Sequence, residues 1–275
     1  MSQKSNSNQQ YVPDSRKIIE EKLKAVKHKF LVLSGKGGVG KSTVAANLAL
    51  ALVQKYPGKV GIIDADIHGP NIPKMLGVED KKPYGDGVNV FPVEGPFGLK
   101  IISLAFFLES TDSPVIWRGP MKMKALEQFL TDFTWGELEY LVVDLPPGTG
   151  DESLSIMQLL PKLDGVVIVT TPQDVSLLDT GKALNMVRKM NLRVLGVVEN
   201  MSYFICPDCD KKHFIFGQGG GESLATTFKV PLLGHVPFKG IIRETEDKGM
   251  DQAFDDFRPI AEKIEKIVGE TIPLM

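Results

Sequence analysis

Short apolar runs alternate along the chain with longer segments of mixed polarity. The runs contain almost only apolar residues and lie at Phe30–Leu33, Val60–Ile63, Leu141–Val143, Val166–Thr170, Val194–Val198 and, as a sixth candidate, Leu232–Val236. Runs of this length without polar alternation are typical of strands buried on both faces, as in parallel sheets. The pattern therefore predicts a sheet that is covered on both sides.

The segments between these runs have the spacing of amphipathic helices. Helices are predicted from Asp14 to about Lys29 and at Ser42–Gln54, Met121–Phe129, Ser153–Leu160, Val175–Met190, Glu222–Phe228 and Pro259–Val268. Alternating strands and helices predict an α/β fold, a mostly parallel β-sheet flanked by helices on both faces. A hairpin is also predicted around Asn89–Val93, in a Gly- and Pro-rich segment for which the sequence suggests no function.

The domain organisation follows from the same pattern. Residues 1–13 contain few apolar side chains, so we expect a flexible N-terminal tail. Residues 14–275 contain no repeat and no linker-like stretch, and they are predicted to form a single domain.

A glycine-rich motif follows the first predicted strand and precedes a predicted helix. It has the form Gly35-x-x-x-x-Gly40-Lys41-Ser42, the spacing of a phosphate-binding P-loop. We expect Lys41 to contact the outer phosphates of ATP and the Ser42 hydroxyl to bind magnesium. The predicted nucleotide-binding residues are Gly35, Lys36, Gly37, Gly38, Val39, Gly40, Lys41, Ser42 and Thr43. A glycine-rich turn with a chance Lys-Ser pair is the simpler alternative, and the flanking strand and helix argue against it.

Carboxylates follow two other predicted strands. Asp144 ends one strand and precedes a Pro-Pro-Gly loop, while Asp64 and Asp66 follow another. A magnesium site beside a P-loop needs a strand-end carboxylate, which predicts Asp144 as a ligand through water. One of Asp64 and Asp66 is expected to support magnesium and the other to orient the attacking water. The alternative is that these acids are solvated loop residues or turn formers.

Lys36 is a second lysine inside the phosphate loop. Because Lys41 already supplies the usual phosphate lysine, Lys36 needs another role. It either crosses to the nucleotide of a partner subunit, as an arginine finger does, or is a solvated lysine that raises the local potential. The first interpretation links hydrolysis to dimer formation.

Cys206 and Cys209 are the two cysteines of the chain, and they form a Cys-Pro-Asp-Cys motif after a predicted strand. Two thiolates at this spacing hold one metal ion or part of an iron–sulfur cluster. A two-fold dimer would bring two such pairs together as four ligands. Three interpretations are open from the spacing: a shared 4Fe–4S cluster, a structural zinc completed across the dimer or by His213, and a thiol–disulfide pair.

Charge and composition exclude some functions. The formal net charge is −2, from 32 basic and 34 acidic residues, which argues against nucleic acid or an anionic membrane as the partner. No apolar run approaches the roughly 18–20 residues that span a bilayer, and the first ten residues lack the apolar stretch of a signal peptide. We therefore expect a cytoplasmic protein with no membrane and no nucleic-acid partner.

The motif Lys36-Gly-Gly-Val-Gly-Lys-Ser-Thr43 resembles the deviant Walker A class of P-loop ATPases, which includes MinD, ParA and the nitrogenase iron protein. The resemblance implies a dimer that encloses two ATP molecules, with Lys36 contacting the phosphates of the opposite subunit. It also implies that Asp66 is the carboxylate nearest the attacking water and that Asn200 contacts adenine. The catalytic residues implied are Lys36, Lys41 and Asp66.

A narrower resemblance rests on five motifs in order. They are Asp64–Pro73, Trp117-Arg118-Gly119-Pro120, Asp144–Asp151, Glu199-Asn200-Met201 and Cys206-x-x-Cys209. Together they resemble the Mrp/ApbC family of iron–sulfur carrier ATPases over residues 29–237. The resemblance implies a homodimer that holds a labile 4Fe–4S cluster on the Cys pair and delivers it to apo-proteins. The N-terminal tail has no cysteine, so a second cluster site, as some members have, is not expected.

Two other functions remain as alternatives. A positioning ATPase of the MinD or ParA kind would carry zinc at the Cys pair and a basic amphipathic helix at one terminus. Here the C-terminal segment has Ile260, Ile264 and Ile267 on one face but also carries several glutamates, which favours packing onto the body. An ATP-gated electron donor would keep its cluster through redox cycles instead of passing it on.

Overall fold

The computed structural model describes residues 15–66, 69–107, 119–238 and 254–270. Three features of the sequence interpretation lie outside these ranges. They are the tail of residues 1–13, Ile67 and His68 in the aspartate loop, and Trp117 and Arg118.

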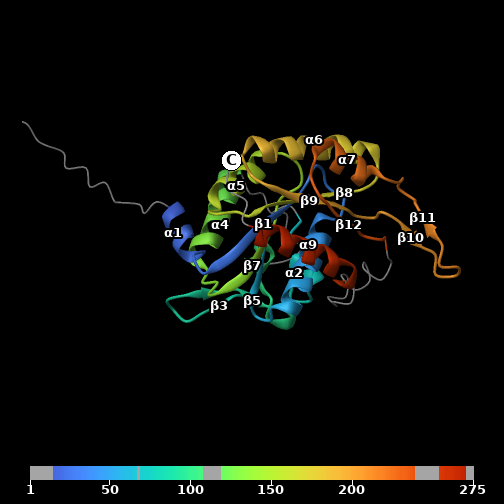
Figure 1. Ribbon diagram of the computed structural model, residues 1–275. Coiled ribbons are helices and arrows are strands. Elements are labelled where there is room, and N and C mark those ends of the chain that lie inside the picture. The colour runs from blue at the N-terminus through green and yellow to red at the C-terminus, as the bar shows by residue number, and fades with distance from the viewer. Residues whose placement is uncertain (1–14, 67–68, 108–118, 239–253, 271–275) are drawn as a thin grey trace, which may run out of the picture.

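An eight-stranded sheet forms the centre of the molecule, in the order β12-β9-β8-β1-β7-β2-β6-β5 (Figure 1). Its strands are β1 (Val26–Ser34), β2 (Val60–Asp64), β5 (Val93–Glu94), β6 (Lys100–Ser103), β7 (Leu138–Asp144), β8 (Gly165–Thr170), β9 (Val194–Glu199) and β12 (Leu232–His235). All neighbours from β12 to β6 pair in parallel, and β5 pairs antiparallel with β6 at one edge. The predicted mostly parallel sheet is confirmed.

Helices pack against both faces of this sheet (Figure 1). One face carries α2 (Lys41–Lys55), α3 (Ile72–Met75) and α9 (Arg258–Gly269) with the short η3 (Phe254–Phe257); the other carries α1 (Ser15–Lys22), α4 (Gly119–Asp132), α5 (Asp151–Leu159), α6 (Asp174–Lys189) and α7 (Gly220–Phe228). Side chains of β1 alternate between these two cores, because successive strand residues point to opposite faces. Phe30 and Val32 belong to the α2 side, whereas Leu31 and Leu33 belong to the other. None of these helices, within the ranges described, is long and apolar enough to cross a bilayer.

The remaining elements are short. They are two 3-10 turns, η1 (Pro96–Gly98) and η2 (Leu104–Phe107), and two hairpins, β3 (Tyr84–Gly85) with β4 (Val90–Phe91) and β10 (Phe204–Ile205) with β11 (Lys212–His213). The hairpin predicted around Asn89–Val93 is present, but its first strand lies earlier than expected, because Tyr84 pairs with Phe91.

The first helix was predicted too long. It ends at Lys22, and residues from Val26 onward belong to β1, where Val26 pairs with Leu138. Polar residues between Val26 and Phe30 concealed the start of the strand, yet each has its own partner. Lys27 pairs with Glu139, His28 lies 3.2 Å from an Asp164 oxygen, and the buried Lys29 ammonium donates to the Val26 carbonyl. Tertiary contacts thus hold a strand that the hydrophobic pattern alone does not indicate.

The carboxyl ends of the central strands meet at one edge of the sheet. Registers place Asp144 at the end of β7 opposite Val32 of β1 and opposite Asp64 at the end of β2. On the other side of β1, β8 and β9 end next to each other, with Thr170 opposite Glu199. In open parallel sheets, ligands bind in the crevice beyond these ends, so this edge positions the candidate site.

Candidate functional site

The glycine-rich loop runs from the end of β1 to the first turn of α2. Gly38 and Gly40 have φ values of +78° and +77°, a left-handed conformation that favours glycine. Gly35 is required for a different reason: a Cβ there would lie 2.3–2.4 Å from backbone atoms of Asp179 and Thr180 in α6. The sequence thus shapes a loop whose backbone N–H groups are able to surround an anion.

The side chains of Lys41 and Ser42 both contact Asp144 beside this loop. The Lys41 ammonium lies 2.7 Å from Asp144 Oδ1, and the Ser42 hydroxyl donates to Asp144 Oδ2 at 2.5 Å. Asp144 is fully buried, and 6% of Lys41 is exposed. The predicted lysine, hydroxyl and strand-end carboxylate are therefore brought together, from β7 and from the start of α2.

Asp64 lies beside this group at the end of β2. Its Oδ2 accepts hydrogen bonds from the Ser103 hydroxyl at 3.0 Å and from the Ile72 backbone N–H at 3.3 Å. Burial, reinforced by the neighbouring charge of Asp144, raises the pKa of Asp64 to about 8. Burial also raises the pKa of Asp144, while the Lys41 ammonium acts in the opposite direction. Asp64 and Asp144 lie side by side in a buried, low-dielectric environment. Ionising both carboxyl groups therefore costs free energy unless further positive charge lies nearby.

Ser103 was not recognised from the sequence. It ends β6, a strand of four residues whose apolar signal is limited to Ile101 and Ile102. A small polar residue directly after an apolar pair was the available signal, and it was too short to distinguish from a turn.

Asp66 and Lys36 line the open part of the site. Together with the glycine-rich loop, Gly69, Asn71, Met75 and Pro147, they border a cavity of about 240 Å³. One Asp66 oxygen lies 3.8 Å from the Lys41 ammonium, so this carboxylate faces the position of the outer phosphates. Lys36 is half-buried at the other side of the cavity.

The Pro-Pro-Gly loop closes over the end of β1. The Gly148 N–H donates to the Ser34 carbonyl at 2.9 Å, and its φ of +87° again favours glycine. A backbone that bends in this way brings Pro147 to the cavity wall. The loop thus borders the same cavity as the glycine-rich loop.

Asn200 joins the site from the end of β9. Its side-chain amide donates to the Val39 carbonyl of the glycine-rich loop at 2.9 Å, and it packs against Gly40. The predicted adenine contact is therefore beside the loop, although its amide is here bonded to the loop backbone.

The donor set fits magnesium. Asp64, Asp66, Asp144 and the Ser42 hydroxyl present hard oxygen atoms close to the Lys41 ammonium. Oxygen ligands of this kind are those that magnesium prefers beside phosphates. A divalent cation at this position would also offset the charge that raises the pKa of the two buried acids.

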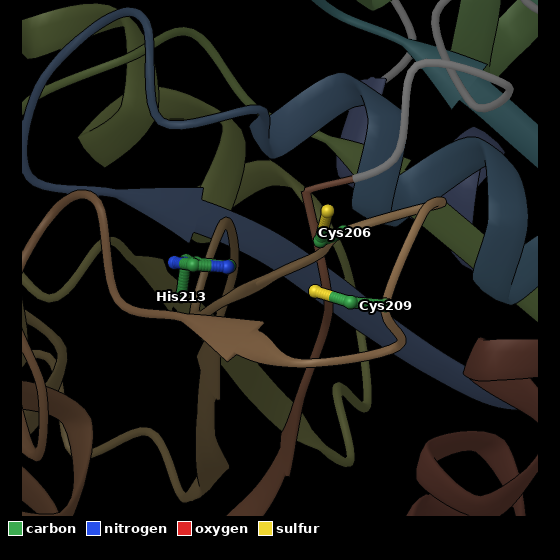
Figure 2. Close-up of side chains that lie close together, drawn as sticks. All are labelled: Cys206, Cys209 and His213. Carbon is green, nitrogen blue, oxygen red and sulfur yellow. The ribbon is translucent and has the colours of Figure 1, made fainter.

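Cys206 and Cys209 lie on a separate hairpin, formed by β10 and β11, that extends beyond the body of the sheet (Figure 1). The Cys206 N–H donates to the Lys211 carbonyl, and the Asp210 N–H donates to the Cys206 carbonyl, so the turn holds both thiols on one side. Cys206 is half-buried and Cys209 is exposed. Figure 2 shows the two thiols close together, with His213 beside them.

These three residues form a candidate metal site. The sulfur atoms of Cys206 and Cys209 and a ring nitrogen of His213 all lie within 4.8 Å of one another. The backbone N–H of Asp208, together with the Cys209 thiol, holds the pKa of Cys206 below its usual value, which favours the thiolate that binds metal. Three donors from one chain are one short of a tetrahedral site.

Exposed apolar side chains surround this hairpin. Ile205, Phe214, Ile215 and Phe238 are all exposed by 37% or more. Large apolar side chains gathered on one exposed element are typical of a surface that contacts another protein.

A family model and several relatives match this chain. The model is that of the ParA family, described as NUBPL iron-transfer P-loop NTPase, and it matches residues 25–272. A protein of Methanocaldococcus jannaschii, called iron-sulfur cluster carrier protein, is 48% identical over 94% of this chain and 93% of its own length. One of Saccharolobus solfataricus with the same name is also 48% identical, over 91% of this chain and 87% of its own.

Solved structures give a consistent result. A nucleotide-binding protein of Archaeoglobus fulgidus, in complex with ADP and with cobalt, is 37% identical and superposes with a TM-score of 0.77. The match covers 88% of this chain and 95% of that one. The cell division ATPase MinD of Pyrococcus furiosus is 23% identical, with a TM-score of 0.61 over 88% of this chain and all of its own, and it shares the fold.

Proposed function

Because the chain belongs to the ParA family of iron-transfer P-loop NTPases, we propose that it is an ATP-hydrolysing carrier of iron–sulfur clusters. The observation that carries this proposal is the presence of two sites on one chain. One is the P-loop site with its buried carboxylates, and the other is the exposed Cys206–Cys209 pair. The names of the relatives in Methanocaldococcus and Saccharolobus support the same function.

ATP and magnesium occupy the P-loop site in this proposal. Lys41 contacts the outer phosphates, while Ser42 and Asp144, with Asp64 behind them, hold magnesium directly or through water. Asp66 is the only one of the three acids that borders the open cavity, so it is placed to orient the attacking water.

Lys36 acts on the nucleotide of a second subunit. Its position at the cavity wall, apart from the Lys41–Asp144 pair, supports a role other than holding the phosphates of its own subunit. A lysine supplied in trans would stabilise charge in the transition state only in the dimer.

The iron–sulfur cluster is the cargo, held by Cys206 and Cys209. One chain supplies two thiolates, and a two-fold dimer supplies the four that a 4Fe–4S cluster uses. The exposure of the pair and the apolar side chains around it support a shared site at an interface between copies. Apo-proteins that receive the cluster reach it from the same exposed side.

Zinc remains the competing ligand, because His213 lies within coordinating distance of both thiols. Two Cys and one His are a donor set that zinc uses in many proteins. Such a zinc would join two subunits as a structural metal, and the ATPase would then carry no iron–sulfur cluster.

The first experiment is anaerobic reconstitution of the full chain with iron and sulfide, followed by metal and sulfide analysis and absorption spectroscopy. We expect about four irons and four sulfides per dimer, lost in a Cys209→Ser variant. His213→Ala is the matched control, because it removes the zinc ligand and leaves both thiols. Stable zinc in the isolated protein, lost in His213→Ala, with no cluster formed, would contradict the carrier function.

A further inference from the structure

One buried carboxylate holds both ends of residues 202–221, the segment that contains the cysteine hairpin. Glu199, at the end of β9, is 1% exposed. One of its oxygens accepts from the Ser202 hydroxyl at 2.5 Å, and the other accepts from the Gly221 N–H at 2.5 Å. Ser202 lies just before β10 and Gly221 lies in the first turn of α7, so the segment starts and ends at one side chain.

Other contacts of Glu199 make this arrangement rigid. His235 in β12 lies 3.0 Å from the oxygen that Ser202 binds, and its other ring nitrogen lies 3.4 Å from Glu222. Gly221 has no room for a side chain, because a Cβ there would lie 2.9 Å from the Cβ of Glu199. At the base of the hairpin, the Phe238 N–H donates to the Tyr203 carbonyl, and the Phe238 ring packs edge-on against Phe216.

The residue next to Glu199 belongs to the nucleotide site. Asn200 donates to the Val39 carbonyl in the glycine-rich loop and packs against Gly40. The end of β9 therefore contacts the nucleotide loop through the side chain of Asn200, and both ends of residues 202–221 through that of Glu199. A displacement of the loop on nucleotide binding is able to reach the segment that carries the thiols through these two adjacent residues.

We propose that Glu199 is the positioning residue that couples nucleotide state to the geometry of the Cys206–Cys209 pair. This proposal rests on the proposed function, in which ATP acts on a cluster held by that pair. Glu199 touches neither the nucleotide nor the thiols. It fixes the cysteine segment to β9. A shift of Asn200 therefore moves the two cysteines, whereas an unattached segment would keep its position.

The test uses the reactivity of the thiols, since the chain has two cysteines and both lie in the hairpin. The rate of N-ethylmaleimide labelling is measured on the full, cluster-free protein with and without ATP and magnesium. In the wild type we expect nucleotide to change this rate by at least about fivefold, the lower range of couplings between protein sites.

Glu199→Ala is the informative variant. It removes both carboxylate oxygens, so neither the Ser202 hydroxyl nor the Gly221 N–H keeps its acceptor. The amide of Glu199→Gln would not serve, because its NH₂ group is able to donate to the Ser202 hydroxyl. Both ends of the segment are released in Glu199→Ala, and we expect the labelling rates with and without ATP to agree within about twofold. ATP binding, measured with a fluorescent ATP analogue, should stay within about twofold of wild type, because Glu199 does not touch the P-loop.

Glu222→Ala is the matched control. Glu222 is the other carboxylate beside His235, and its removal leaves the bonds of Glu199 to Ser202 and Gly221 in place, so this variant should keep the wild-type response. If Glu199→Ala fails to fold, Ser202→Ala releases one end only and should at least halve the response. A wild-type response that survives in Glu199→Ala, or no response in the wild type, overturns the coupling.

The same measurement separates this proposal from the proposed function. A protein that forms no cluster on reconstitution, but whose thiols respond to ATP through Glu199, would keep the coupling and lose the iron–sulfur cargo. A protein that forms the cluster but shows no nucleotide response of its thiols would keep the cargo and lose the coupling.

Discussion

The nucleotide site and the cysteine hairpin are built in opposite ways. The nucleotide site draws on the ends of β1, β2, β7 and β9 in the middle of the sheet, and Asp64 and Asp144 are almost fully buried. The hairpin has two strands of two residues each, outside the sheet, and it exposes Cys209. Catalysis by positioning needs a rigid frame, whereas cargo that must be handed on needs ligands that another protein is able to reach.

The two regions also offer different kinds of metal ligand. The buried site offers hard oxygen ligands from several distant segments of the chain, which suit magnesium. The hairpin offers soft thiolates from one short segment and is incomplete within one chain. If a second chain completes the site, as proposed above, the association of the two chains controls the binding of the cluster.

The largest expected effect comes from removing the lysine of the buried site. Lys41→Ala deletes the charge that faces both Asp144 and the outer phosphates, so ATP hydrolysis should fall by a factor of about 100–1000. Phosphate release measured under saturating ATP gives this value. Cluster content after reconstitution should be unchanged, because the hairpin does not contact Lys41. Parallel loss of both properties would show that cluster binding itself, and not only its response to nucleotide, requires Lys41.

Lys36→Ala tests whether the nucleotide site is completed by a second subunit. We expect hydrolysis to fall by a factor of about 10–100, because a cation that stabilises the transition state is lost. Nucleotide affinity should change little. Lys36→Ala subunits mixed with Lys41→Ala subunits sharpen the test. If Lys36 acts within its own subunit, mixing Lys36→Ala and Lys41→Ala subunits restores no activity to either site, whereas action in trans predicts partial recovery in mixed dimers.

Cys206→Ser should affect the hairpin alone. Bound iron should fall at least about tenfold, since one thiolate per chain cannot complete a cluster. The melting temperature should change by only about 2 °C, because a half-buried loop thiol contributes little to the core. Thermal unfolding and iron analysis of the same preparation measure both. Collapse of the metal-free variant would show that the hairpin is structural.

A further effect, which does not involve the reaction itself, is a pH dependence of stability. The folded-state pKa of Asp64, about 8, is raised above the value near 4 expected in the unfolded chain. The folded protein therefore binds the proton more tightly, and metal-free protein should lose stability as the pH rises from about 4 to about 8. Asp64→Asn should flatten this slope, and Asp66→Asn should not. Melting curves across this range, repeated with ATP and magnesium, should show the slope disappear when the cation is bound.

The sequence predicted the fold and the P-loop well because both depend on short-range patterns. Six of the eight strands of the sheet are recognisable as apolar runs, whereas the short β5 and β6 are not, and Gly35 to Ser42 is one continuous motif. Strand ends with Asp64 and Asp144 were recognisable for the same reason. Whether residues 14–275 unfold as one unit remains a prediction, which the cooperativity of the melting curves would test.

Contacts between distant segments could not be predicted. Ser103 was missed because its bond to Asp64 joins two strands that are separated along the chain. The role of Glu199 was missed because nothing local links it to Gly221, 22 positions later. The start of β1 was missed because Lys27, His28 and Lys29 conceal a strand that only its neighbours stabilise. The local pattern of apolar and polar residues predicts where helices and strands lie. Which polar side chains contact each other depends on how these elements pack in the folded chain.

The shared anchor of the hairpin has an evolutionary consequence. Because the segment leaves and returns at Glu199, its length and composition can vary without moving any strand of the sheet. Insertions at such positions are tolerated when the two ends lie close together. We therefore expect a change in the length of this segment to leave the strands of the sheet in place. Grafting residues 199–221 onto a related ATPase of the same fold would show whether the cysteine pair and its anchor transfer together.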